Sequence, residues 1–408
     1  MQDCTVNRRL NARPRRYRAL PVMRVRVLTV AALGLVAALC AGLYGGCGGS
    51  ESPIEVRVKG REQGNVLGFP VIATKNTTRV AGKDPIQDAA AVAAAVYPAI
   101  DGRQPQAVTL VDHKDWAGGI AAAALMAPPF RAPILLTDGD EISGATSDAL
   151  DLLHPTGAPL ARRVQAFKIG DAATPDGLRT FPIQANNPFR LAAAIDEFHI
   201  RATGSPSRNV IIAPTEDPRF AMPAAGWAAR SGDAVLFSGH DSLPPETRAA
   251  VARHERPRIY VLGPKEQISD AVVDQLKRLG RVARISGQNP VTNALVFARY
   301  TDGAFGWGIQ DPGHGLVIAN AERPLDAAAA AALSSSGTYG PLLLTDSAKI
   351  LPRFLRGFLL DIQPGYRSDP VRGVYNHAWV IGDESAVSVA VQTEIDELCE
   401  IVRVRGRS

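Results

Sequence analysis

Two short clusters in the sequence combine residue types that enzymes and metal sites use. Ser238, His240 and Asp241 are the residue types of a hydrolase triad. A triad needs separated positions that converge in space, with the serine on a tight turn such as Gly-x-Ser-x-Gly, and that turn is absent. Asp138 and Asp140 form an Asp-x-Asp pair of the kind that holds a hard cation through carboxylate oxygens. The similar stretches SGHD and TDSA do not repeat this pair, so we interpret both aspartates as solvated loop or helix-capping residues.

Other signatures of catalysis are also missing from the sequence. The seven histidines show none of the spacings of a zinc site, such as His-Glu-x-x-His. The glycines form neither a Walker A motif nor a dinucleotide-binding fingerprint. We therefore predict that the protein is not an enzyme, with no catalytic residue, no metal and no cofactor.

The first 47 residues have the layout of an export signal. A basic stretch from Met23 precedes an apolar run over 27–43, and LYGGCGGS follows. Gly-Gly-Cys before Gly-Gly-Ser resembles a bacterial lipobox, which makes Cys47 the predicted lipidation site. The alternative is an uncleaved anchor helix, although 17 apolar residues are at the short limit for a hydrocarbon core of ~30 Å. Both interpretations predict an extracytoplasmic protein, anchored to the membrane at the cell surface.

Charge and cysteine content agree with export. The whole chain has a net charge of +5. Eight arginines and one acidic residue lie before Cys47, and the rest of the chain has 37 basic and 39 acidic side chains. The folded part therefore gives no argument for a nucleic-acid partner. One cysteine, Cys399, follows the leader, and the stretch EIDELCEIV predicts that it faces the core from a helix.

The elements that position these residues recur along the chain. A Gly-x-Asp/Asn-Pro marker, or its frame without the glycine, precedes alanine-containing helices at Pro85, Pro188 and Pro290, which are 103 and 102 residues apart. Proline suits the first turn of a helix because no N–H donor is needed there. This spacing predicts three copies of one unit of about 100 residues.

Each unit contains four apolar runs that alternate with helices. The first runs cover 107–112, 209–214 and 315–320, the second 133–138, 234–239 and 341–346, the third 166–171, 259–264 and 378–383, and the fourth 179–184, 281–287 and 400–406. Continuous apolar runs alternating with helices predict parallel sheets covered on both faces, in an α/β fold. The alanine-rich stretches over 118–126, 224–230 and 326–333 predict helices that lie close to a sheet.

These residues resemble the type-2 cell-wall-binding repeat, which occurs in three tandem copies on Gram-positive surface proteins. The matching stretches are RVAG, RISG, APILLTD, GPLLLTD, IYVLGPKEQISDAVVDQL and AWVIGDESAVSVAVQTEI, and the resemblance covers roughly 77–408. The chain departs from the pattern where Pro85-Ile86, Pro188-Phe189 and Pro290-Val291 replace Arg-Tyr. The family's Asp-Ala-Leu survives only as Asp326-Ala327-Ala328, with Gly118 and Phe220 at the matching places.

The resemblance implies three tandem Toprim-like or flavodoxin-like modules around a pseudo-threefold axis, and non-covalent adhesion to an anionic wall polymer without catalysis. The organisation it predicts is a signal peptide with lipobox at 1–47, a linker at 48–76, and repeats at 77–182, 183–283 and 284–408.

Binding residues are expected in the loops after the first runs, beyond the carboxyl ends of the strands. These loops contain three cations that can pair with phosphate or carboxylate, and two aromatic rings that can stack on sugars. The candidates are Lys114, Trp116, Arg219, Phe220 and Arg323.

The sequence thus predicts an exported, lipid-anchored envelope protein whose partners are a cell-wall polymer and the membrane. The alternative is a solute-binding lipoprotein of a transport system, which also is an anchored α/β protein of this size. Three equal units argue against the two lobes and hinge cleft of that class. A surface hydrolase would need a catalytic motif that the sequence lacks.

Overall fold

The computed structural model describes residues 71–80, 82–98, 102–336 and 339–404. The predicted signal peptide, Cys47 and most of the linker lie outside these residues. In the part of the chain that is described, none of the helices has the length and apolar character needed to cross a membrane.

The first sheet is formed by four parallel strands in the order β4-β3-β5-β6. Its elements are β3 (Val108–Asp112), α2 (Trp116–Ala122) with the 3₁₀ turn η1 (Ala123–Met126), β4 (Ile134–Thr137), α3 (Gly144–Leu153), the 3₁₀ turn η2 (Pro159–Ala161), β5 (Ala166–Ile169) and β6 (Thr180–Ile183). The strands lie where the four apolar runs of the first unit predict them.

The second sheet has four parallel strands in the order β10-β9-β7-β8. Its elements are α4 (Pro188–Thr203), β7 (Asn209–Pro214), α5 (Pro218–Ser231), β8 (Ala234–Ser238), α6 (Pro245–Arg253), β9 (Arg258–Leu262), α7 (Asp270–Lys277) and β10 (Arg281–Ile285). In both sheets the four strands of the unit therefore lie side by side in the order fourth, third, first, second.

The third sheet has the order β1-β2-β14-β11-β12, and its parallel part repeats the same arrangement. It combines β1 (Val71–Ala73) and β2 (Thr77–Val80) with β11 (Gly315–Asn320), β12 (Leu342–Thr345) and β14 (His377–Ile381). The accompanying helices are α8 (Pro290–Arg299), α9 (Leu325–Ser335), α10 (Arg353–Asp361) and α11 (Val389–Cys399). The α/β class with parallel sheets is therefore confirmed.

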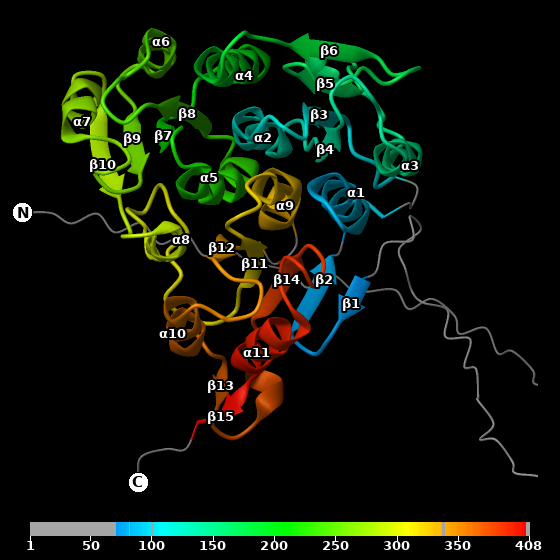
Figure 1. Ribbon diagram of the computed structural model, residues 1–408, viewed down its shortest axis with the longest axis vertical. Coiled ribbons are helices and arrows are strands. Elements are labelled where there is room, and N and C mark those ends of the chain that lie inside the picture. The colour runs from blue at the N-terminus through cyan, green and yellow to red at the C-terminus, as the bar shows by residue number, and fades with distance from the viewer. Residues whose placement is uncertain (1–70, 81, 99–101, 337–338, 405–408) are drawn as a thin grey trace, which may run out of the picture. The chain divides into compact units, whose positions relative to one another are not determined.

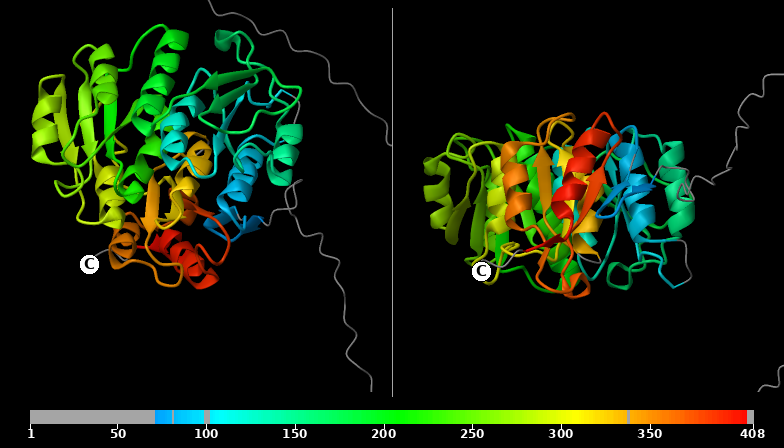
Figure 2. Two further views of the ribbon diagram at one scale, coloured as in Figure 1. Left: turned by 45° about the horizontal axis from the view of Figure 1, so that its top comes forward. Right: turned by 90° about the horizontal axis from the view of Figure 1, so that it is seen from below.

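The fourth strand of the third sheet contradicts the sequence prediction. The run 400–406 was expected to provide it, but β15 (Val402–Arg403) pairs instead with β13 (Gly365–Tyr366) in a separate two-stranded sheet, close to the 3₁₀ turn η3 (Pro370–Arg372). The place beside β14 is taken by β2, from the start of the described chain. Figure 1 shows β2 next to β14, and Figure 2 shows the blue N-terminal segment beside the red C-terminal one.

Helices α1 (Pro85–Val96), α4 and α8 begin at the three marker prolines, as predicted. In each helix an Asp or Asn immediately before the proline accepts a hydrogen bond from the backbone of the first turn. Such capping satisfies donors that the helix leaves unpaired at its start, and proline loses nothing there. The sequence marker is therefore a helix-start signal.

The alanine-rich helices α2, α5 and α9 contact one another, and α9 also contacts α1. In Figure 1, α9 lies between α1 and α5. The approach is close: a Cβ added to Gly119 on α2 would lie 3.0 Å from the Cβ of Ala328 on α9. Small side chains are needed at this distance, which explains the alanine content. Mutual contact of three corresponding helices is what a threefold arrangement requires, and the symmetry itself stays a prediction.

Candidate functional site

The loops that were expected to bind lie at the carboxyl ends of β3, β7 and β11, which are internal strands of their sheets. Each loop leads into one of the three mutually contacting helices. Asp115 caps α2 by accepting from the backbone N–H of Gly118 at 2.8 Å, and Asp217 caps α5 by accepting from Arg219 N at 3.1 Å. Burial raises the pKa of Asp115 above its ordinary value.

Arg219 joins the loops of the second and third sheets. Its Nε and Nη2 donate to the two carboxylate oxygens of Asp217 at 2.8 and 2.9 Å, and its Nη1 donates to Glu322 Oε1 at 3.0 Å. The bidentate bond to Asp217, followed by the bond to Glu322, raises the pKa of Arg219 above its ordinary value. The Arg219 side chain is 41% exposed, but an anionic ligand would compete with two carboxylates already in contact with the guanidinium.

Arg323 is the centre of a buried ionic cluster. Its Nη2 donates to Asp88 on α1, and its Nε lies 2.9 Å from Asp326 Oδ2 at the start of α9. Both carboxylates are fully buried. Burial raises the pKa of both Asp88 and Asp326. The charge of Asp326 raises the pKa of Asp88 further, whereas the Arg323 guanidinium acts to lower both pKa values. We therefore assign Arg323 to the α1–α9 contact.

The two aromatic candidates pack against other side chains of the protein. Phe220 is 4% exposed in the core, beneath the glycine turn at Gly263. Trp116 packs edge-on against Phe237 of the second sheet, with 5.6 Å between ring centroids. The buried ring of Phe220 presents no free face to a sugar, and the partly buried ring of Trp116 is held against Phe237, so we assign both to packing between the sheets and their helices.

Lys114 lies at the tip of the first loop and is exposed. Its backbone N–H donates to Asp112 Oδ1 at 3.0 Å, and in the described part of the chain its ammonium group forms no ion pair. The neighbouring His113 Nδ1 lies 3.3 Å from both Asp112 Oδ1 and Asp138 Oδ1. Two carboxylates therefore contact the backbone of Lys114 or the neighbouring His113, while Lys114 itself is the one candidate cation without an ion pair among the described residues.

The two clusters with catalytic residue types are held by local bonds. Ser238 is buried, and its hydroxyl donates to the carbonyls of Gly239 and Ser242 at 2.9 and 3.0 Å. His240 Nδ1 lies 2.8 Å from Asp241 Oδ2. Within the described ranges, no group of three or more His, Cys, Asp or Glu side chains is placed to hold a metal ion.

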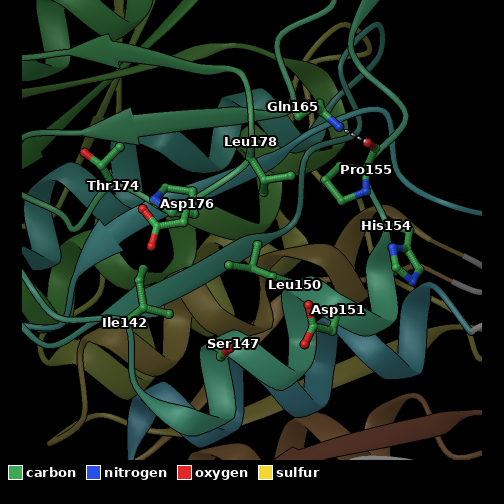
Figure 3. A pocket seen from close by; sticks show the side chains of 11 residues that line it. Ile142, Ser147, Leu150, Asp151, His154, Pro155, Gln165, Thr174, Asp176 and Leu178 are labelled. Carbon is green, nitrogen blue, oxygen red and sulfur yellow. Dashed lines mark hydrogen bonds between the residues drawn. The ribbon is translucent and has the colours of Figure 1, made fainter.

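A cavity of about 370 Å³ lies between α3 and the segment that joins β5 to β6. Figure 3 shows its lining: Asp151 and His154 come from α3 and its end, and Asp176 faces them from the joining segment. Gln165 Nε2 donates to the carbonyl of Pro155 at 2.8 Å across one end. The two aspartates make this cavity unsuited to an anionic ligand.

Sequence reasoning missed a second concave surface, the α8–α10 groove, with a volume of about 430 Å³. Arg299 of α8 and Arg353 and Phe354 of α10 line it. Its two helices were predicted, but the pairing of their side chains across about 60 residues has no signal in the local pattern.

No protein-family model matches the chain. Among curated proteins, it is 26% identical over 186 residues to the amidase enhancer of Bacillus subtilis (strain 168), a match that covers 46% of this chain and 22% of that protein.

Two solved structures are similar over most of the chain. Cwp8 from Clostridium difficile matches with a TM-score of 0.62 and 18% identity, over 80% of this chain and 52% of that one. Cwp6 from the same organism matches with a TM-score of 0.60 and 17% identity, over 80% and 50%. The fold resembles that of Cwp8 and Cwp6. This chain spans about half the length of either structure, and at these identities the likeness concerns the fold alone.

Proposed function

We propose that this protein is an exported, cell-surface adhesion protein that binds an anionic cell-wall polymer non-covalently, without catalysis. The proposal includes a lipid anchor at Cys47 and an arrangement of three wall-binding repeats. Cell-wall polymer and membrane are its partners.

The observation that carries the proposal is the likeness of fold, over 80% of this chain, to the cell wall proteins Cwp8 and Cwp6. The partial similarity to an amidase enhancer favours the same setting. The strand order that recurs in the three sheets supports a repeat origin. This chain matches only about half of each similar structure. We therefore propose polymer binding for the matched fold and not for the rest of those proteins.

Charge limits where a polyanion can bind. The chain beyond the leader has a net charge of −2, so attraction must come from local groups of cations. Arg323 is occupied by buried carboxylates, whereas Lys114 and Arg219 reach the surface. We expect these two residues to contribute modestly, because each exposed ion pair is worth about 0.2–1 kcal/mol.

A solute-binding lipoprotein is the second candidate, and the α3 cavity in Figure 3 is the observation that favours it. The cavity lies within the first unit. Its acidic lining would select a cationic or neutral solute. A rise in melting temperature with such a small molecule would support this alternative.

Co-sedimentation tests the adhesion proposal. The full-length protein, in mild detergent, is mixed with purified envelope material, either native or stripped of anionic secondary polymers. We expect sedimentation with native material only. Equal sedimentation with both would show that the anionic polymer is not the ligand, and no sedimentation with either would contradict adhesion to the wall.

A further inference from the structure

The α8–α10 groove combines an apolar floor with two guanidinium groups. Leu295 and Phe358 form part of the floor, and Phe358 is 3% exposed. The Arg299 guanidinium carbon lies 4.8 Å from the centre of the Phe358 ring, and its Nη2 donates to Asp361 Oδ2 at 2.7 Å. Asp361 is the one acidic residue that lines the groove.

The rim of the groove exposes an aromatic ring next to a second cation. Phe354 is 48% exposed, and the Arg353 guanidinium carbon lies 4.8 Å from its ring centre. Among the described residues, Arg353 has no acidic partner. The groove therefore has two cations and one carboxylate, which gives it a local positive charge in a chain whose net charge beyond the leader is negative.

Gly357 keeps the groove open. It lies inside α10, where glycine lowers the stability of the helix relative to alanine. A Cβ added at Gly357 would meet no atom within 4 Å, so close packing does not require glycine here. The missing side chain instead leaves free space in the groove that it lines.

The corresponding helix pair in the second unit, α4 and α6, is joined differently. There Arg253 donates to the carbonyl of Ala193 at 2.8 Å, and the buried side chains of His254 and Asp196 lie 3.1 Å apart. Buried polar contacts join α4 to α6, whereas α8 and α10 are joined by the half-exposed pair of Arg299 and Asp361. The contact between α4 and α6 is thus closed by buried polar groups, whereas the contact between α8 and α10 is open to solvent.

We propose that the α8–α10 groove is a binding site for an acidic sugar unit of a glycan. An exposed aromatic ring packs against the apolar face of a sugar, and a guanidinium binds carboxylate or phosphate through paired hydrogen bonds. A volume of about 430 Å³ lies within the range of roughly 300–1,000 Å³ that is typical of small-ligand sites. The site rests on the proposed function, since the wall polymer would supply the glycan.

The test measures binding of defined glycans to the full-length protein in mild detergent by titration calorimetry. The probes are trigalacturonic acid for carboxylate and glucose 6-phosphate for phosphate, with methyl-esterified trigalacturonic acid as the neutral control. We expect one charged probe to bind. Arg353→Ala and Phe354→Ala should each weaken that binding about tenfold, while Arg190→Ala, at an exposed arginine near the start of α4, should leave it unchanged.

Gly357→Leu separates groove filling from folding. Leucine at this helix position should raise the melting temperature, or leave it unchanged, and should abolish probe binding. Gly144→Leu is the matched control, because a Cβ at Gly144 also meets no atom within 4 Å. A stable Gly357→Leu protein that binds the charged probe as before would overturn the proposal, as would equal binding of the methyl ester.

Two outcomes distinguish this site from the adhesion proposal. If the unmodified protein sediments with wall material and the groove variants do so equally well, the groove is not the site and adhesion stands. If the protein binds a charged probe through the groove but does not sediment with walls, the site stands and wall adhesion fails. A change in self-association without a change in probe binding would assign the groove to a second copy of the chain and overturn the proposal.

Discussion

Arg79 and Gln392 are 313 residues apart, and their buried side chains share a hydrogen bond of 2.8 Å between Arg79 Nε and Gln392 Oε1. Arg79 Nη1 donates to the carbonyls of Gly382 and Asp383, and Nη2 donates to the carbonyl of Val387. One arginine therefore holds strand β2 to the third sheet and to helix α11.

Replacing Arg79 by alanine should destabilise the protein strongly. The substitution leaves buried carbonyl groups without donors, and we expect a loss of about 3 kcal/mol in the free energy of unfolding, since unmet buried polar groups cost about 1–3 kcal/mol each. Urea denaturation followed by circular dichroism measures it. Arg190→Ala, at an exposed arginine near the start of α4, is the control. Equal stability of the two variants would contradict the role of Arg79.

Removal of the first 80 residues should unfold or aggregate the third sheet. Without β2, strand β14 becomes an open edge of a parallel sheet, and open edges pair with other chains. Removal of only the first 58 residues keeps every described strand. Size-exclusion chromatography should show a monodisperse species for the shorter deletion and aggregates for the longer one. The same profile for both deletions would contradict the role of β2 as the strand that covers the edge of β14.

The buried pair Asp88 and Asp326 should make stability depend on pH. Burial raises both pKa values above their ordinary value of 3.8. Between pH 4 and the folded-state pKa values, the folded protein holds more protons than the unfolded chain, so stability falls as pH rises through this window. Asp88→Asn should flatten this fall. Melting temperatures from pH 4 to 9 measure it, and parallel curves for both proteins would exclude the pair as the cause.

Cys399 should resist thiol reagents in the folded protein. It is fully buried, and burial raises its pKa to about 12, whereas the thiolate is the reactive form. In a chain that lacks residues 1–58 it is the sole cysteine, so its labelling rate reports opening of α11. We expect slow labelling that becomes fast at the urea midpoint; fast labelling without urea would contradict burial.

Much of the fold follows from local pattern in the sequence. Continuous apolar runs predicted strands such as β7 and β11 with the observed bounds, and the prolines at 85, 188 and 290 predicted three helix starts. Cys399 faces the core, as predicted. These features depend on hydrophobic burial and helix capping, which act over a few residues.

The closing strand of the third sheet was missed, although one signal was present. RISG begins within β10, the fourth strand of the second sheet, so RVAG, near the start of the described residues, should belong to a fourth strand as well. Among the described residues, the third sheet is the one whose own unit supplies no fourth strand. The local sequence pattern favours 400–406 as the fourth strand because this run also contains apolar residues and follows a helix.

Site residues were harder to predict than strands because charge and aromaticity do not reveal a side chain's partners. Arg323 meets Asp88 from a helix 235 residues away, and Phe220 turns into the core. Both contacts depend on the tertiary fold, and the position of a residue in a loop does not predict them. The α8–α10 groove was missed for the same reason.

Binding of purified wall polymer to the protein is the decisive measurement for adhesion. Released anionic polymer is titrated into the full-length protein, before and after chemical neutralisation of its charged groups, at low and high salt. We predict saturable binding that is lost on neutralisation and weakened by salt, because the attraction is between charges. Binding that survives neutralisation, or no binding at low salt, would contradict adhesion through an anionic wall polymer.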